Sequence, residues 1–587
     1  MNNYETQKEF RLKNGSTVMN YIRHFSMTEK TIFGILVFIA GLTAFLMTIQ
    51  VSDLFMVTVP ANGGELREGM IGLPHMINPV VAITDVDRDI STLVYSGLMK
   101  YSGKDLTTDI AESYKISDDG LTYTFKIRPD VFFHDGSELT TADIAYTIQK
   151  VQNVAIKSPR RADWNNVTVN VISPTEIQFV LKQAYSPFIT NTTLGILPKH
   201  IWNNISDEQF VFSDYNIKPI GSGPYEIKTL LKDKDGIPLQ YKIIASNKYY
   251  GRRAYIDSII VQFFSDEDKA FQALEKGTID SLASISSKKI KNISGEINNE
   301  KYNVISTPLP RIFGVFFNQN NNPVLAEKAV RQALDLAIDR QQIINLALDS
   351  YGIALDSPLP SESNISINKA QNIELAISLL EKSGWVKNKA TGIYEKKGPK
   401  NSLQILSFEL MTADAPDLKQ TAQLLNESWA KIGAKVEVKI FDPSELYQNI
   451  IRPRKYDALL FGQLIGKDRD LYAFWHSSQR NAPGLNVAMY TNSKADSILE
   501  SIRSNEDQSE NQAKYSELKK IIQNDIPAIF IYSPNFIYVL PTNINIDRKI
   551  DSISSKNIIS NITNPQDRWN SVTDWYINTE KVWKIFK

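Results

Sequence analysis

The 587-residue chain contains no cysteine and only five histidines. Without cysteine it has no disulfide, thiolate metal site, cysteine nucleophile or lipid-modified cysteine anchor. The histidines are far apart in the sequence: His24, His75, His134, His200 and His476. HExxH, P-loop, GxGxxG and GxSxG motifs are also absent. These absences argue against an enzyme, unless scattered carboxylates converge in space, and we expect no catalytic residue, no metal ligand and no cofactor.

The chain has no excess of either charge, because Lys+Arg and Asp+Glu both total 65. A neutral chain without a basic block does not attract nucleic acid, so we expect no nucleic-acid partner and look instead for a local pocket. Hydrophobic residues make up 42% and charged residues 22%, an ordinary globular composition. The length is too great for one hydrophobic core and predicts two or three domains.

A long uncharged segment lies near the N-terminus, from Thr31 to Ser52. About 20 apolar residues in a helix span the ~30 Å hydrocarbon layer of a membrane. A cleaved signal peptide is the alternative, but its apolar core is roughly 7–15 residues long and ends in a small-residue cleavage site, and no Ala-x-Ala follows here. We therefore expect an uncleaved transmembrane anchor over residues 31–51.

The residues on either side of this segment predict its orientation. Arg23 and Lys30 precede it closely, and basic residues near a span favour the cytoplasmic side. We expect a cytoplasmic tail over residues 1–30 and a short tether over 52–63. The remaining residues then lie on the extracytoplasmic side of the cell membrane.

The stretch from residue 114 to 151 predicts a strand, turns and a helix. Residues 114–127 are expected to form a hairpin, because apolar residues from 121 to 127 occur at every second position, and Asp119-Gly120 suits a type I′ turn. Thr140 is a candidate helix cap with Asp143 at the third helical position. Further along, Gly221 to Tyr225 indicate a sharp turn into another strand.

The middle of the chain predicts alternating helices and strands. A helix is expected to begin at Pro323, and apolar residues from Leu418 to Ile432 recur at helical spacing before a strand over 436–440. Near the C-terminus, IPAIFIYS and FIYVLPT indicate two short β segments. A β-rich region on both sides of an α/β region predicts two lobes, with the chain crossing between them twice.

Several blocks of sequence, in order over about 500 residues, carry a resemblance to a known family. They are LVYSGLMKYSGKDLTTDIAESYKISDDGLTYTFKIRPDVFFHDGSELTTADIAYTI, GSGPYEIK, FQALEKGTIDSL, VFFNQNNNPVLAEKAVRQALDLAIDRQQII and LLEKSGWVKNKATGIYEKKG. They resemble the family 5 extracytoplasmic solute-binding proteins of ABC importers, which include oligopeptide, dipeptide and nickel binders. The resemblance covers roughly residues 63 to 587.

The resemblance implies an α/β, bilobal periplasmic-binding-protein type II fold with an extra β-rich subdomain in lobe I, here preceded by one transmembrane helix. Lobe I is expected over 64–306 and again over 526–587, and lobe II over 307–525. The implied function is capture of a peptide or other small solute by a monomer, which delivers it to an ABC permease and its ATPase subunits. His134 is then a scaffold residue in a turn.

The chain departs from the family in two places. It has a membrane helix without a lipid-modified cysteine. Family members often carry an Asp-Tyr-x-Asp-Pro-like segment in lobe II, and the comparable stretch here is KYDALLFGQLIGKDRDLYAFWHSS. Asp470 falls near the second acid, Leu471 replaces the proline, and Asp468 fits the first acid only with a shift of one residue.

This stretch supplies the candidate ligand-binding residues. A peptide ammonium in a closed cleft requires a carboxylate, because an unpaired buried charge costs several kcal/mol. Asp468 and Asp470 are the candidates, with a turn cap or a solvent-exposed position as the alternative. Trp475 is expected to wall a side-chain pocket and Phe474 to pack in the core. Gly462 and Gln463 lie on a strand that offers backbone groups to a peptide, and glycine permits close approach.

Three other interpretations remain open. A nickel or metal-chelate binder of the same family would use histidine or a bound chelator, and His476 alone lies near the candidate residues. A membrane-anchored hydrolase or sensor on the same scaffold would need a nucleophile and base that the sequence does not reveal. A purely structural surface protein would have a filled cleft.

Overall fold

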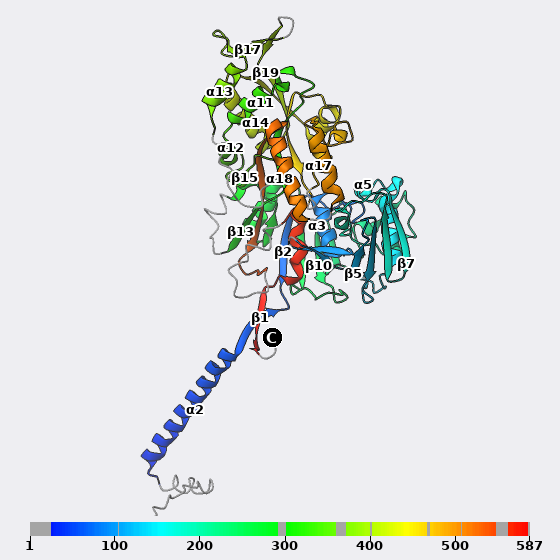
Figure 1. Ribbon diagram of the computed structural model, residues 1–587. Coiled ribbons are helices and arrows are strands. Elements are labelled where there is room, and N and C mark those ends of the chain that lie inside the picture. Colours follow the sequence, from blue (N-terminus) through cyan, green and yellow to red (C-terminus); the bar gives the residue numbers. More distant parts are fainter. Residues whose placement is uncertain are drawn as a thin grey trace, which may run out of the picture. The chain divides into compact units, whose positions relative to one another are not determined.

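The computed structural model describes residues 25–103, 105–290, 301–359, 371–398, 402–466, 470–505, 508–546 and 562–584. The chain divides into two compact units. One contains residues 1–61 and 579–587, and the other contains residues 62–578. The second unit is the globular domain of the molecule (Figure 1).

The first unit is built around helix α2 (Met27–Phe55). Ser26 and Glu29 form a reciprocal capping box at its N-terminus. Of the described residues, only this helix is long and apolar enough to cross a membrane, and its segment Met27–Met47 has a mean hydropathy of 2.0 with none of it buried. Strand β1 (Met56–Ala61) follows at once and pairs with β23 (Asn578–Trp583). The segment expected to be a tether is thus mostly the end of a helix and a paired strand.

One sheet of twelve strands runs through the second unit. Its main path is β20 (Lys435–Phe441), β19 (Ser407–Ala413), β21 (Ala458–Leu464), β14 (Arg311–Phe317), β22 (Ala528–Pro541), β12 (Ser281–Ala283), β2 (Glu65–Ile71), β11 (Ser258–Phe264), β10 (Pro238–Ala245) and β9 (Tyr225–Lys232). Two further strands, β13 (Tyr302–Pro308) and β15 (Gly352–Ala354), pair with β22. Parallel pairs join β19 to β20 and β21, and β2 to β11 and β12; the other pairs are antiparallel.

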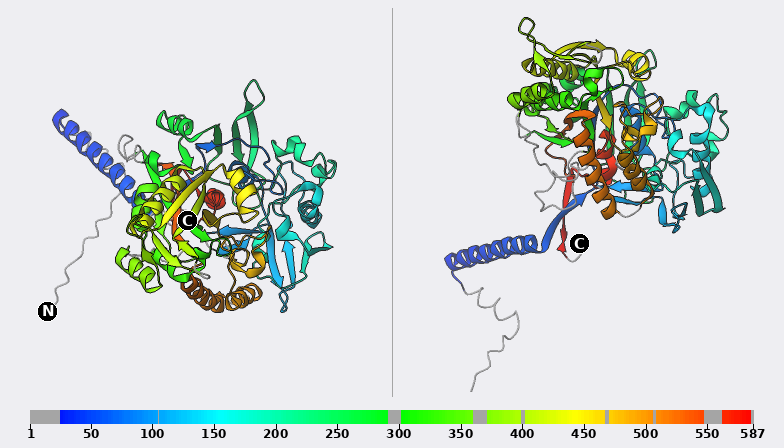
Figure 2. Two further views of the ribbon diagram at one scale, coloured as in Figure 1. Left: turned by 90° about the horizontal axis from the view of Figure 1, so that it is seen from above. Right: turned by 45° about the horizontal axis from the view of Figure 1, so that its top comes forward.

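Three smaller sheets also occur among the described residues of this unit. They are β5 (Ala111–Ile116), β6 (Thr122–Ile127), β8 (Glu176–Leu181) and β7 (Val167–Ser173); β3 (Met99–Ser102) and β4 (Asp105–Thr108); and β16 (Val386–Lys387), β17 (Tyr394–Lys397) and β18 (Leu403–Ile405). The four-stranded sheet lies at one side of the domain beside α4 (Thr141–Gln152) and α5 (Arg161–Trp164), as Figure 1 and Figure 2 show. It forms the expected β-rich subdomain of lobe I.

The longer helices lie on both sides of the large sheet. They are α3 (Asp85–Val94), α8 (Glu267–Glu275), α11 (Lys328–Leu336), α12 (Arg340–Ala347), α13 (Ile373–Lys382), α14 (Pro416–Lys431), α17 (Ser493–Ser504) and α18 (Gln508–Asp525). Short helices are α6 (Phe188–Asn191), α7 (Lys199–Trp202), α10 (Pro323–Ala326), α15 (Pro443–Glu445) and α16 (Tyr472–Trp475). The described residues also contain one π-helix, η5 (Leu446–Ile451), and the 3₁₀-helices η1 (Val154–Ile156), η2 (Phe210–Phe212), η3 (Asp214–Asn216), η6 (Ser477–Gln479) and η7 (Pro565–Asp574).

Strand β22 joins the two lobes. Its residues 528–532 pair with β14 in lobe II, and its residues 535–541 pair with β13 in lobe I. The two β segments expected near the C-terminus are therefore one strand of 14 residues. Pro534 sits where the pairing changes, and Pro308 and Pro310 sit at the other crossing, between β13 and β14. We propose that the second lobe boundary lies inside β22 at residues 533–534, later than the boundary at 525/526 expected from sequence.

The β-rich subdomain follows the sequence pattern closely. β5 and β6 pair antiparallel, and Tyr123, Phe125 and Ile127 are buried on one face. Thr140 and Asp143 cap α4 reciprocally, as predicted. The predicted type I′ turn is wrong: only Gly120 has a positive φ (67°), and its amide donates to Ser117. The hairpin is therefore closed by a longer loop with glycine in its left-handed position.

Lobe II contains the predicted α-to-β unit. The apolar stripe of α14 is buried against Leu410 and Phe408 of β19, with Trp429 fully buried at its end. The helix predicted to begin at Pro323 is interrupted, because Glu327 leaves helical geometry and starts α11. The Glu327 carboxylate accepts hydrogen bonds from the Trp385 indole and from Lys396. The helical spacing of the sequence does not reveal these contacts.

A buried ion cluster ties the C-terminal segment to lobe I. Arg568 on η7 donates two bonds of 2.8 Å to Asp89 of α3 and one of 3.2 Å to Glu68 of β2. Glu68 also accepts from Ser281 and Tyr538. Burial raises the pKa of the Glu68 and Asp89 carboxyls. Attraction to the Arg568 guanidinium acts in the opposite direction and reduces this rise. Five separate segments therefore meet in this cluster.

Candidate functional site

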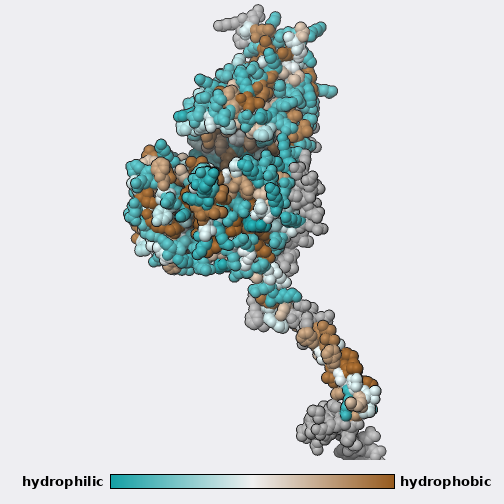
Figure 3. All heavy atoms as spheres, turned by 180° about the vertical axis from the view of Figure 1, so that it is seen from behind, coloured by the Kyte–Doolittle hydropathy of each residue, from teal (hydrophilic) through white to brown (hydrophobic). Residues whose placement is uncertain are grey.

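A recess separates the two lobes. Figure 3 shows it as a shadowed furrow across the domain, with hydrophobic residues visible inside it. The C-terminal end of β21 lies at the crossing between the lobes. There Leu464 pairs with Arg311, and the amide of Ile465 donates to the carbonyl of Pro310. Residues 462–464 are therefore at the lobe I end of the lobe II sheet.

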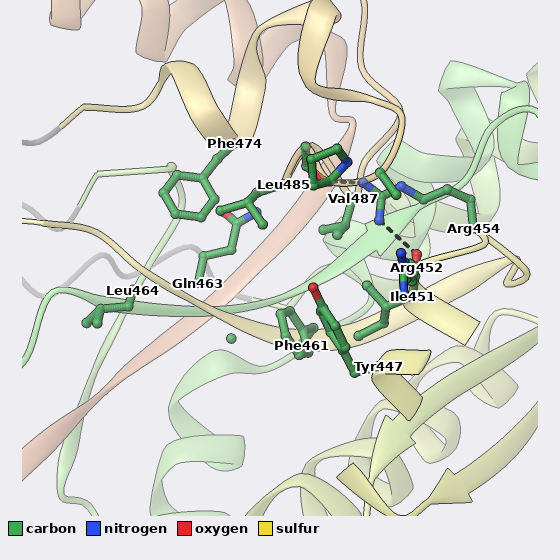
Figure 4. A pocket seen from close by; sticks show the side chains of 14 residues that line it. Tyr447, Ile451, Arg452, Arg454, Phe461, Gln463, Leu464, Phe474, Leu485 and Val487 are labelled. Atoms are coloured by element: carbon green, nitrogen blue, oxygen red, sulfur yellow. Dashed lines mark hydrogen bonds between the residues drawn. The ribbon is translucent and has the colours of Figure 1, made fainter. Parts of the chain in front are cut away.

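A pocket of about 450 Å³ opens at this end of β21. Its walls come from β21, from η5 and from the loop after η6, as Figure 4 shows. Apolar side chains dominate, among them Phe461, Phe474, Leu485 and Val487. The volume falls in the range of small-molecule sites, which are mostly apolar with a few placed polar groups.

Gln463 is the buried polar residue of this pocket. It is 4% exposed, and within the described part of the chain neither its amide nitrogen nor its amide oxygen has a hydrogen-bond partner. Arg454, which also lines the pocket, is held by three carbonyls, because its guanidinium donates to those of Ile451, Arg480 and Gly484. The two sequence candidates Gly462 and Gln463 thus both line the pocket.

Gly462 has a packing reason to be glycine. A Cβ there would lie 2.7 Å from the ring of Phe313, which itself stacks on Tyr532 at 5.4 Å. The close approach predicted at Gly462 is therefore made by the protein's own aromatic ring on that face.

Asp470 is paired within the protein. Its carboxylate accepts bonds of 2.9 and 2.6 Å from Arg503 and one of 3.0 Å from the Tyr472 amide. Arg503 also lies 4.0 Å from the Tyr472 ring centre. Burial by itself lowers the pKa of Arg503, but the bonds to Asp470 raise it overall. A ligand ammonium would have to compete with this guanidinium for Asp470.

The same pair joins the lobes. Tyr185, which follows the lobe I strand β8, donates to Asp470 at 3.4 Å, and its ring lies 5.2 Å from the Arg503 guanidinium. The amide of Ser186 donates to the Arg503 carbonyl at 3.1 Å. We call this set, Tyr185, Ser186, Asp470 and Arg503, the interlobe contact. Sequence spacing did not reveal it, because residues 185, 470 and 503 are distant in the chain.

Two aromatic residues of α16 lie differently from their expected roles in the pocket. Trp475 is fully buried in the lobe II core, where its ring lies 5.7 Å from Phe530 and 6.1 Å from Tyr490. It cannot wall a pocket from that position. Phe474 packs against the core, as expected, and also lines the pocket (Figure 4). The short helix α16 points consecutive residues in different directions. Asp468 lies outside the described residues.

His134 is a neutral link between two turns. Its Nε2 lies 3.0 Å from the Gly223 carbonyl, and its Nδ1 accepts from the Gly221 amide at 3.3 Å. Burial lowers the pKa of His134 to about 4. The ring therefore joins the FFHDG turn to the GSGPY turn and is scaffold in lobe I.

The described residues contain no cluster of three or more His, Asp or Glu side chains suited to hold a metal ion. His476 is buried under the Tyr472 ring at 4.0 Å, and its Nδ1 lies 2.8 Å from the Ser478 hydroxyl. This histidine caps a turn.

Comparison with known proteins decides the family. The sequence pattern of the bacterial extracellular solute-binding proteins, family 5, matches residues 105–483. The chain is also 31% identical over 502 residues to the oligopeptide-binding protein AppA of Bacillus subtilis, covering 83% of this chain and 89% of that protein. This chain belongs to family 5 of the bacterial extracellular solute-binding proteins.

Solved structures agree with this membership. AppA of Bacillus subtilis in complex with a nonapeptide matches this solute-binding protein with a TM-score of 0.66 and 27% identity, over 88% of this chain and 100% of AppA. CtaP of Listeria monocytogenes matches with a TM-score of 0.72 and 26% identity, over 88% and 99%. The expected bilobal α/β fold is confirmed.

Relatives of other specificity occur as well. The nickel-binding periplasmic protein of Escherichia coli is 27% identical over 474 residues, 77% of this chain and 82% of that protein. The family consists of solute-binding proteins, and this solute-binding protein is the substrate-binding component of an ABC importer.

Proposed function

We propose that this solute-binding protein captures peptides between its two lobes and delivers them to an ABC permease with ATPase subunits. The single observation that carries the peptide assignment is the 31% identity to AppA over most of both chains. The recess between the lobes and the apolar pocket at β21 support it, because a peptide brings apolar side chains and main-chain amides to one site (Figure 3).

The proposed mechanism is closure about the two crossings. Prolines at 308, 310 and 534 flank the places where the strands pass between lobes, so the lobes are joined by two narrow connections. The interlobe contact then forms on closure. Asp470 holds this contact, and we assign the ligand ammonium to Asp468 in preference to Asp470, whose charge Arg503 already neutralises.

Helix α2 is proposed as a permanent anchor that holds the monomeric binding domain at the outer face of the cell membrane. Its exposed apolar length supports this assignment. Anchoring raises the concentration of the binder near its permease. Intact mass of the protein recovered from membranes distinguishes an anchor from a cleaved signal peptide.

The test of the proposed ligand is direct. The full chain is purified in detergent without denaturation, and bound molecules are extracted and identified by mass spectrometry. We expect peptides. Calorimetry with a nickel salt, and with nickel and histidine together, addresses the alternative that the nickel-binding relative of Escherichia coli raises. Nickel-dependent heat without any peptide binding would replace the proposal.

A further inference from the structure

We propose that the β21 pocket is a specificity pocket for one apolar side chain of the ligand, and that the Gln463 amide reads the main chain of that same ligand residue. This inference rests on the proposed function, capture of a peptide. It adds the chemical class of residue that the pocket takes and the group that positions it.

The first argument is the cost of the Gln463 amide. A buried amide without partners loses the free energy of its hydrogen bonds with water, so proteins rarely leave both amide atoms unsatisfied. At 4% exposure, Gln463 has no partner for either amide atom among the described residues. Figure 4 shows its side chain rising from β21 into the pocket. An external partner explains this placement.

The second argument is the geometry of the partner. A primary amide offers one acceptor and donors side by side. An extended peptide residue offers its own N–H and C=O in the complementary pattern, as a strand does to its neighbour. The Gln463 oxygen therefore accepts the ligand N–H, and its nitrogen donates to the ligand C=O. A lone carboxylate or ammonium would satisfy only half of this amide.

The third argument is the character of the walls. Phe461, Phe474 and Val487 give an apolar lining, and none of the described residues that line the pocket is an aspartate or glutamate. The charged residues of this described lining are Arg452 and Arg454, so a ligand lysine or arginine side chain that enters between these walls would meet positive charge. The pocket is therefore selective for aliphatic or aromatic side chains.

Entry requires a local opening. In this structure both Gln463 amide atoms are buried. Leu485 is 44% exposed and lies on the loop after η6, so its side chain can turn aside as a ligand residue enters. When the Leu485 side chain turns back over the bound ligand residue, it shields the Gln463 amide from water.

The experiment uses the full chain in detergent and a random nonapeptide pool, with bound peptides sequenced by mass spectrometry. We expect one ligand position to be enriched in Phe, Leu, Ile, Val or Met and depleted of Lys and Arg. The most enriched peptide is then measured by calorimetry against the wild type and Gln463→Met. Loss of two hydrogen bonds lowers affinity about 10- to 100-fold.

Chemical modification of the ligand isolates the amide. N-methylation at the enriched position removes the ligand N–H that donates to the Gln463 side-chain oxygen. We expect it to weaken binding to the wild type about tenfold or more and to have no further effect on Gln463→Met. Equal penalties in both proteins, or an unchanged affinity of Gln463→Met, would overturn the inference and leave peptide capture intact. Failure of the wild type to bind any nonapeptide would overturn both.

Two further variants separate binding from folding. Gln152→Met removes a half-buried amide that donates to Trp164 and Val167 carbonyls in lobe I, and we expect lower thermal stability with unchanged peptide affinity. Gln463→Met in the ligand-free state should be at least as stable as the wild type, because it removes unsatisfied polar atoms. Leu485→Trp narrows the pocket from an exposed position and should shift the enriched position toward Ala and Gly. An unchanged preference in Leu485→Trp would contradict the pocket assignment.

Discussion

Acidification should destabilise this protein through His134. The neutral ring joins two turns of lobe I, with Nδ1 accepting from the Gly221 amide and Nε2 donating to the Gly223 carbonyl. A protonated ring has no acceptor at Nδ1, so the first bond is lost. The nearby Lys248 ammonium, which donates to the His134 carbonyl, also opposes a positive ring.

The size and sign of the effect follow from the pKa. Burial lowers the pKa of His134 to about 4, whereas an unfolded histidine titrates near 6.5. Between these values the unfolded state binds more protons, so the free energy of unfolding falls as pH falls. The contribution is complete above pH 6.5. It declines by about 2 to 3 kcal/mol on the way to pH 4.5, at 1.36 kcal/mol per pH unit.

Urea unfolding monitored by tryptophan fluorescence at pH 7.5, 6.0 and 4.5 measures this loss. Other groups also titrate in this range, so the informative quantity is the difference in the free energy of unfolding between the wild type and His134→Gln. We expect this difference to shrink by about 2 kcal/mol across the range. His75→Gln, at an exposed position of lobe I, is the control and should follow the wild type. A His134→Gln difference that does not change with pH would refute the reasoning.

Three further predictions concern other contacts. Arg568→Met leaves Glu68 and Asp89 buried without their cation and should lower the free energy of unfolding by about 3–5 kcal/mol in urea; a loss below 1 kcal/mol would contradict the role of the buried cluster. Gly462→Ala places a Cβ against the Phe313 ring and should cost about 1–3 kcal/mol by the same assay, whereas a neutral result would show that the ring has room to move. Arg503→Ala removes the guanidinium bonds to Asp470 from the interlobe contact and should speed peptide release roughly fivefold in stopped-flow measurements, with little change in the association rate; slower or unchanged release would contradict a role of this ion pair in holding the lobes closed.

The sequence predicted those parts of the fold whose pattern is local. The alternation of Tyr123, Phe125 and Ile127, the cap formed by Thr140 and Asp143, and the stripe ending at Trp429 all depend on neighbours a few residues apart. Such patterns follow directly from strand and helix periodicity. The resemblance to the family supplied the bilobal arrangement, which no local pattern encodes.

The sequence did not predict features set by distant contacts. Pro534 made β22 look like two short strands, because proline breaks a ladder, yet here it falls where the pairing passes from one lobe to the other. Trp475 is buried in the core and Phe474 lines the pocket while packing against the core, because the packing of α16 fixes which side chain is covered. The sequence does not show that Arg503, 33 residues further along the chain, forms an ion pair with Asp470.

The central claim is that two lobes close around a peptide, and the absence of cysteine makes a direct measurement simple. Cysteines introduced at the exposed positions Ser113 of lobe I and Lys431 of lobe II are the only sites for thiol-reactive spin labels. Saturating peptide should shift and narrow the distance distribution between the two labels. The same distribution with and without bound peptide would contradict capture by closure.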